Sequence, residues 1–290
     1  MDAIRQDIDA LPAIAKDFIQ RVVRILEKHV PSTSFAIFLF GSLSHASDKV
    51  NCVDGTSDVD LLVIVKDDVS TAARDAWVEL NALQQILGNH VSRRGIIPSI
   101  LRVVERQTGM HENIFMSRES DFKNARFSKI FRTNKILTWL LAPASIVLGS
   151  ALCHMARVHG NAEIEGSVRA MQATIGKEKH ILPDLVRSFL MNVILALGAT
   201  ILLPVTNKAT KYAVEATKWS MYAATYLMIG ERPSKASQKR FFERLGIDAN
   251  FLDRWMELSQ NYTPDVKYTV KTPWNVVKIH ALGFKIKKIK

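Results

Sequence analysis

Hydrophobic residues recur along the chain in two rhythms, which together predict a protein that contains both helices and strands. Apolar residues spaced three or four positions apart predict amphipathic helices over residues 3–29 and 71–87. Continuous apolar runs at residues 35–40 and 61–65 predict buried strands, the second beginning at about residue 58, and a third strand is expected over 96–105. The pattern therefore predicts an α+β fold, in which helices flank a sheet.

Beyond about residue 160 the helical rhythm continues without strands. Helices are expected at 163–175, 182–203, 209–229, 235–245 and 251–260. The change divides the chain into an α+β domain over residues 1–160 and a helical domain over residues 161–290, whose C-terminal segment is basic. The helical domain is expected to bind a substrate or a partner.

Two long apolar runs carry no charge and approach the length of a membrane span. The run over 136–155 contains Pro143 and Gly149, which predict a break between two elements. The run over 188–205 is apolar all round, which is typical of a central bundle helix that is covered on every side. We therefore expect no integral membrane insertion.

Charge is uneven along this chain of 290 residues and net charge +11. Residues 161–290 hold 20 of the 39 basic residues but only 11 of the 28 acidic ones, so an anionic partner is expected there. RNA or an acidic protein would fit. Two cysteines give no disulfide framework, and the N-terminus does not read as a secretory signal. A cytoplasmic protein is the expectation.

Candidate chemistry lies where the first strand ends and the second begins. Gly41 and Ser42 follow the first strand, and Asp58 and Asp60 open the second. Alternate residues of a strand share a face, so both carboxylates should project together while Val59 points into the opposite layer. Paired carboxylates of this kind suit Mg²⁺. Gly41 permits close approach of the backbone to a phosphate, and Ser42 adds a hydroxyl.

These motifs resemble those of the polymerase-β-like nucleotidyltransferase superfamily, in particular its aminoglycoside and minimal types with a C-terminal helical domain. The likeness is best over residues 35–65, and the fifteen-residue spacer over 43–57 is longer than relatives usually have. The resemblance implies a mixed sheet and two Mg²⁺ ions bound by Asp58 and Asp60. It also implies transfer of a nucleoside monophosphate from an NTP, ATP by default, to a hydroxyl acceptor: a small molecule, a protein or RNA.

The same resemblance implies a third carboxylate on the strand beside Asp58 and Asp60. Glu105, at the end of the expected third strand, is the first choice, with Glu112 and Asp121 as alternatives. This group would share a metal ion and accept the proton of the attacking hydroxyl.

In the helical half, the resemblance makes Lys218 and Lys235 candidate phosphate contacts. A competing hypothesis is a catalytically inactive nucleotidyltransferase fold that binds a nucleotide, RNA or a partner protein. A third carboxylate far from the aspartate pair would favour that alternative.

Overall fold

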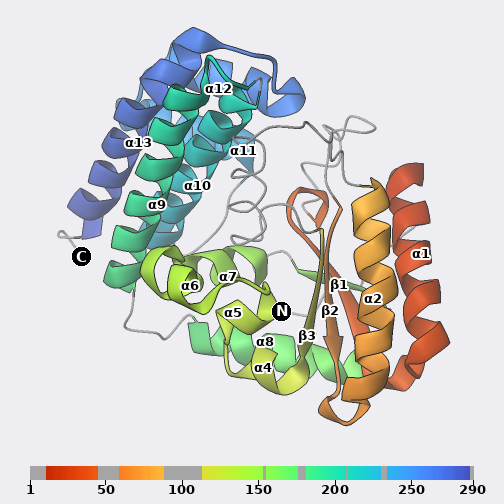
Figure 1. The fold of residues 1–290 in the computed structure, drawn as a ribbon. Coiled ribbons are helices and arrows are strands. Elements are labelled where there is room, and N and C mark those ends of the chain that lie inside the picture. Colours follow the sequence, from red (N-terminus) through yellow and green to blue (C-terminus); the bar gives the residue numbers. More distant parts are fainter. Residues whose placement is uncertain are drawn as a thin grey trace. The chain divides into compact units, whose positions relative to one another are not determined.

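The computed structural model describes residues 11–44, 59–87, 113–152, 155–175, 181–206, 208–229 and 234–287. The chain divides into two compact units (Figure 1). The first comprises Met1–Trp139 and His154–Ile175, and the second comprises Leu140–Cys153 and Gly176–Lys290. The described strands all belong to the first unit, whereas the second is built from helices, so the predicted α+β class is confirmed.

The described strands form one four-stranded mixed sheet in the order β3-β2-β1-β4. The strands are β1 (Phe35–Phe40), β2 (Asp60–Val65), β3 (Ile114–Arg118) and β4 (Ala156–Gly160). β1 pairs antiparallel with β2 and β4, whereas β2 and β3 run parallel. The first two strands confirm the sequence prediction, while β3 and β4 were not predicted.

Helices α1 (Ala13–His29) and α2 (Ser70–Leu87) cover one face of this sheet (Figure 1). Both were predicted, and α1 is confirmed from Ala13 onward. Alternate strand residues such as Ile37 and Val63 are fully buried against Val22 of α1 and Leu80 of α2. Burying a side chain of this size contributes about 1.5–3 kcal/mol, so this two-layer core holds the sheet edge in place.

Short helices follow β3. They are α4 (Glu119–Lys123) and α5 (Phe127–Ile130), both in contact with β3. Helix α8 (Glu165–Ile175) packs on α4, where the Ser167 hydroxyl donates to the Glu119 carboxylate at 2.5 Å. These contacts keep α8 in the first unit, although it lies beyond the boundary predicted at residue 160.

The uncharged run over 136–155 is broken as predicted. It contains the end of α6 (Lys135–Leu141) and then α7 (Ala144–Leu152), with Pro143 between them. The backbone N–H and hydroxyl of Ser145 both donate to the buried carboxylate of Asp184, at 2.7 and 2.5 Å. These bonds tie α7 to the other helices of the second unit.

The second unit is organised around three long helices that pack on one another: α9 (Ile181–Leu202), α10 (Ala209–Ile229) and α13 (Val266–Lys287). Two shorter helices, α11 (Lys235–Arg244) and α12 (Ala249–Asn261), accompany them. Four of these elements match the predicted helices to within two residues. Helix α13 was not predicted, because Pro273 interrupts its helical pattern.

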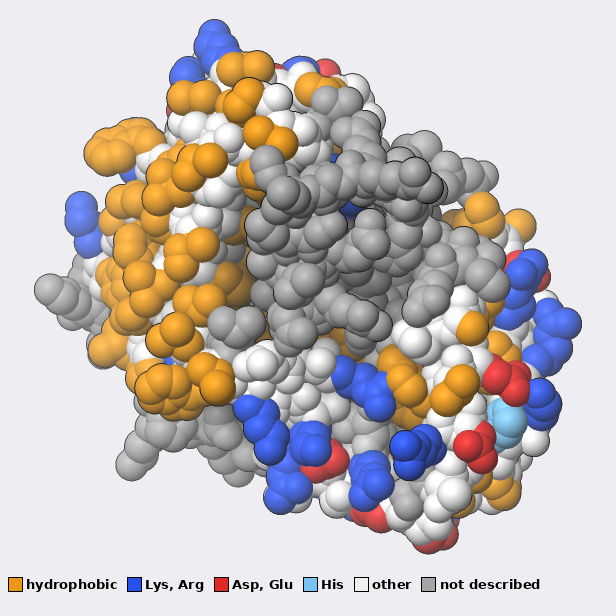
Figure 2. Space-filling model, viewed as in Figure 1, with side chains coloured by type: hydrophobic (Ala, Val, Ile, Leu, Met, Phe, Trp, Pro, Cys, Tyr) orange, Lys and Arg blue, Asp and Glu red, His pale blue; other side chains and the backbone are white. Residues whose placement is uncertain are grey.

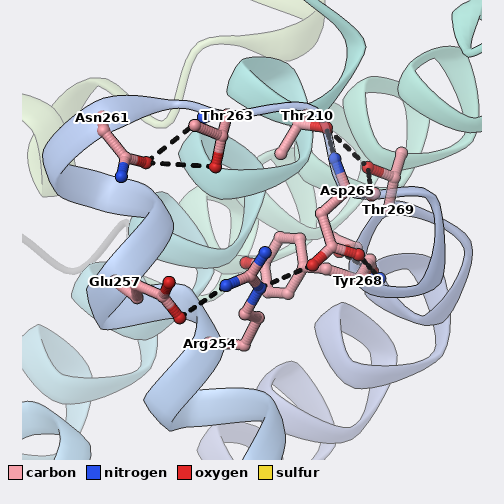
Figure 3. A network of polar contacts seen from close by, with 9 residues as sticks. Thr210, Arg254, Glu257, Asn261, Thr263, Asp265, Tyr268 and Thr269 are labelled. Carbon is pink, nitrogen blue, oxygen red and sulfur yellow. Dashed lines mark hydrogen bonds and ion pairs between the residues drawn. The ribbon is translucent and has the colours of Figure 1, made fainter.

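A polar network fixes the first turn of α13 (Figure 3). The Asp265 carboxylate accepts from the backbone N–H of Tyr268 at 2.8 Å and from Nε of Arg254 on α12 at 2.5 Å. The backbone N–H of Asp265 donates to the Thr210 hydroxyl on α10 at 2.8 Å. Asp265 thus caps α13 and joins it to two neighbouring helices.

Pro273 sits inside α13 and has no N–H to donate to the carbonyl of Thr269. The hydroxyl of Thr200 on α9 lies 3.4 Å from that carbonyl and 3.1 Å from the carbonyl of Ala196 in its own helix. Its single proton is therefore shared between the two carbonyls, and α9 packs beside the place where the proline removes a helical donor.

The prediction that the uncharged run over 188–205 is a bundle helix covered on every side is wrong. Within the described residues, α9 is the one helix long and apolar enough to cross a membrane by length and composition, yet only 28% of its most apolar 18-residue window is buried. Leu190, Ile194 and Ile201 are exposed. Sequence shows that a helix lacks charge, but only the tertiary contacts determine how many of its faces are covered.

Candidate functional site

Asp60 and Gly41 are brought together at one edge of the sheet. Strand β1 ends at Phe40, whose Cα pairs with that of Asp60 at the start of β2. Gly41 follows in a left-handed conformation, with φ of 80°. A Cβ on Gly41 would lie 2.3 Å from Oδ2 of Asp60, so the carboxylate occupies the space that any side chain would need.

The turn after Gly41 closes compactly. Residues Ser42–Ser44 form a 3₁₀ turn. The Ser44 hydroxyl donates to the carbonyl oxygen of Gly41 at 2.9 Å. Gly41 and the backbone of Ser42 are thereby fixed beside the Asp60 carboxylate.

The alternation of side chains around Asp60 follows the prediction. Val59 is buried with the core beneath α1 and α2, whereas Asp60 is half-buried. Asp60 therefore shares its face with Phe40, which lies beside it on β1. The ring of Phe40 is 5.9 Å from that of Phe115 on β3, which in turn contacts Phe131 at 5.1 Å. The residue paired with Asp60 thus belongs to an aromatic cluster on this face of the sheet.

The strand beside β2 is β3, in the position predicted for residues 96–105. Leu61 pairs with Ile114, and the Leu61 N–H donates to the carbonyl oxygen of Asn113 at 2.7 Å. Asp58, Glu105 and Glu112 lie outside the described residues, so the assignment of the second and third carboxylates stays a prediction. Asn113, which follows Glu112 in the sequence, is described and lies at the same edge as Asp60.

Asp121, the remaining alternative, belongs to the other end of the sheet. Because β2 and β3 are parallel and Val65 pairs with Arg118, the end of β3 lies five residues along the strand from Asp60. At about 3.3 Å per residue this is roughly 16 Å. Asp121 follows beyond Arg118 in α4 and forms an ion pair with Arg126 at 3.0 Å. It cannot share a metal ion with Asp60.

The two lysines predicted to contact phosphate lie in the second unit, in different settings. The ammonium of Lys218 is 2.6 Å from the Glu215 carboxylate, which also accepts from the Tyr262 hydroxyl at 3.2 Å. Burial opposes the charge on Lys218, but Glu215 outweighs it and raises the pKa of the ammonium. Lys218 is thus a structural ion-pair partner within α10. Lys235 opens α11, whose N-cap Ser234 accepts from the backbone N–H of Ser237.

The opposite end of the sheet holds an open surface hollow of about 610 Å³. Its charged groups have partners: Lys66 pairs with Glu163 at 3.3 Å, His159 with Glu27 at 3.0 Å, and Arg157 with Glu165 of α8. These pairs leave little reason to assign ligand binding to the hollow, and it lies at the wrong end of β1 and β2 to serve Asp60.

The described residues contain no group of three His, Cys, Asp or Glu side chains that could bind a metal ion. Of the predicted carboxylates, Asp60 and Asp121 are described; only Asp60 lies at this end of the sheet, and carboxylate oxygens are of the type that Mg²⁺ takes. No model of a known protein family matches the chain, and no curated protein sequence matches it. The assignment of function therefore depends on the residues and geometry of this edge.

Proposed function

We propose that this protein is an Mg²⁺-dependent nucleotidyltransferase that moves a nucleoside monophosphate from an NTP to a hydroxyl acceptor and releases pyrophosphate. The observation that carries the proposal is the contact between the Asp60 carboxylate and Gly41. Gly41 ends one strand, and the Asp60 carboxylate that opens the antiparallel neighbour fills the space beside it, so the glycine and the acid of the sequence motif lie against each other. The mixed sheet is the support expected for such a site.

Asp58 and Asp60 would hold the Mg²⁺ ions together with a third carboxylate. Bound there, Mg²⁺ would supply charge neutralisation for the triphosphate and acidify the acceptor hydroxyl. Glu112 is a better candidate for the third carboxylate than Glu105, because it precedes Asn113 in the chain and Asn113 accepts the hydrogen bond from Leu61.

Gly41, Ser42, Asp60 and the third carboxylate would then each have a distinct role. Gly41, without a side chain, lets the triphosphate approach the backbone, and Ser42 offers a hydroxyl donor to a phosphate oxygen. The third carboxylate accepts the proton of the attacking hydroxyl. The half-buried setting of Asp60, against Phe40 and Gly41, keeps its carboxylate oriented before the substrate binds, which lowers the cost of reaching the reactive geometry.

Labelled-nucleotide transfer tests the proposal. The purified protein is incubated with Mg²⁺, each α-labelled NTP and cell lysate, and the species that becomes labelled is identified. Asp60→Asn should lower the rate on the order of 10³-fold, because a metal ligand loses its charge. Asp75→Asn is the matched control, since Asp75 is an exposed carboxylate on α2 in the same unit.

Two results would count against the proposal. Transfer by Asp60→Asn at the wild-type rate would remove Asp60 from the metal site. Nucleotide or RNA binding by the wild-type protein, with no transfer to any lysate component, would instead support the catalytically inactive alternative.

A further inference from the structure

One face of the second unit carries a long apolar surface. On α9 the exposed apolar residues recur every three or four positions, and on α13 every four. They are Leu182, Val186, Leu190, Ile194, Leu197 and Ile201 on α9, and Val266, Val270 and Trp274 on α13. We call this set the α9–α13 face. Figure 2 shows the band of hydrophobic side chains that follows these helices.

The two apolar rows belong to one surface because the helices that carry them are neighbours. The Ser188 hydroxyl lies 3.4 Å from Nε2 of His280, and the Thr200 hydroxyl reaches the Thr269 carbonyl. Residue numbers rise along α9 as they fall along α13, so the helices are antiparallel. At about 1.5 Å per residue, α9 with its 22 residues is roughly 33 Å long. The face is therefore an extended strip along α9, which the apolar row of α13 widens near Thr200, where Thr269 lies.

Lysines line the outer border of the strip. Lys267, Lys271, Lys278 and Lys285 are exposed on α13. The first two each follow an apolar residue of the face by one position, about 100° around the helix. Thr269 and His280, which meet α9, lie on the other side of the apolar row. The order across the surface is therefore α9, the apolar row of α13, and then the lysines.

Acidic groups are missing from this part of the described surface. Helix α13 contains no Asp or Glu, and the one acid of α9, Asp184, is buried and bonded to Ser145 and Arg187. Trp274 is 64% exposed, and the Lys278 ammonium lies 5.5 Å from its ring centre. An exposed tryptophan beside lysines is the combination found where proteins meet the headgroup region of a bilayer.

We propose that the α9–α13 face binds the surface of an anionic lipid bilayer, with both helices lying in the plane of the interface. Apolar side chains would enter the boundary between headgroups and acyl chains, while the lysines would meet anionic headgroups. Charge complementarity favours this occupant over a second copy of the chain. A symmetric pair of copies would bring two acid-free, lysine-lined α13 helices to one interface. The proposal is independent of nucleotidyl transfer.

Vesicle flotation with the full chain tests the lipid assignment. Protein should float with vesicles of phosphatidylcholine containing about one-third phosphatidylglycerol, and much less with phosphatidylcholine alone. Lys267→Gln with Lys271→Gln should weaken binding roughly 30-fold, from about 5-fold per lysine. The matched control is Lys129→Gln with Lys135→Gln, two exposed lysines of the first unit. High salt should weaken the wild-type interaction as well.

A second pair of variants tests the apolar row. Ile194→Glu with Ile201→Glu changes exposed positions only, so the helices should remain folded by circular dichroism while flotation is lost. Val78→Glu on α2, where Val78 is 65% exposed, is the control and should float normally. Unchanged flotation of the isoleucine variant would overturn the proposal. The proposal would also be overturned if the wild type failed to float and instead formed a dimer that the isoleucine variant dissociates. The same holds if the wild type failed to float and instead bound RNA through the lysines alone.

Discussion

Gly41→Ala is the sharpest test of the candidate site, because it displaces the Asp60 carboxylate without altering its chemistry. The new Cβ would lie 2.3 Å from Oδ2 of Asp60, 3.2 Å from Cγ and 3.3 Å from Cβ. Ordinary carbon contacts need about 3.5 Å, so the carboxylate oxygen must retreat by about 1 Å. Because Asp60 is short and opens a paired strand, it can do so only by leaving its rotamer or by shifting β2.

The stability cost has two parts. A non-glycine residue at φ of 80° costs roughly 1–2 kcal/mol, and an off-rotamer Asp60 adds about 1 kcal/mol. We therefore expect Gly41→Ala to lower the free energy of unfolding by about 2–3 kcal/mol. Gly246→Ala is the matched control, since Gly246 has φ of 85° but no atom within 4 Å of the place that a Cβ would take. It should show the backbone cost alone.

Activity should fall further than stability suggests. A misplacement of about 1 Å at a reacting centre can cost on the order of 10²-fold in rate, so the folded Gly41→Ala protein should transfer nucleotide about that much more slowly. Gly246→Ala should transfer at the wild-type rate. Urea unfolding and the labelled-NTP assay on the same preparations give both quantities. A folded Gly41→Ala variant with wild-type turnover would show that Asp60 takes no part in the reaction.

Three further predictions concern the second unit, and urea unfolding checks each. Lys218→Met should lower the free energy of unfolding by about 1–3 kcal/mol, because it leaves the Glu215 carboxylate without its ion-pair partner. Adding Glu215→Gln should restore part of this loss, and no loss in Lys218→Met would show that the pair does not contribute to stability. Burial lowers the pKa of His280 from 6.5 to about 4, so protonation opposes folding as the pH falls from 6.5 to 4. Wild type should lose about 3 kcal/mol relative to His280→Leu over that window, and parallel pH profiles would contradict this. Burial opposes ionisation of Asp265, but Tyr268 N–H and Arg254 outweigh it and lower its pKa. Asp265→Asn should therefore cost about 1–2 kcal/mol near neutral pH, a difference that disappears as the pH falls through the lowered pKa of Asp265; a difference that persists in acid would contradict the assignment.

The local hydrophobic pattern was sufficient to predict an element when the element's own consecutive residues encode its burial. Residues 35–40 are six consecutive apolar residues, and they form β1 over that range. Helix α10 likewise has the predicted bounds of 209 and 229. In both cases burial of a whole face or a whole segment is encoded in consecutive residues, so no distant partner is needed to recognise the element.

The pattern failed where an element depends on its neighbours. Strand β3 has five residues and ends in Ser117 and Arg118, and it is a strand because it pairs with β2, about fifty positions earlier in the chain. Helix α13 continues through Pro273 in a bundle in which it packs on α9 and α10. Short-range periodicity contains neither partner, so neither element could be predicted from it.

Residue identity alone set the chemistry of the candidate edge: Gly41 and Ser42 after one strand, and Asp60 at the start of the next. Contacts between distant segments settled where these groups lie. Antiparallel pairing of Phe40 with Asp60 sets the carboxylate against Gly41, and the parallel register of β3 removes Asp121 from the site. Such contacts also leave α9 with an uncovered face. The physical reason is that side-chain type is a local property, whereas distance and burial arise from contacts between residues far apart in the chain.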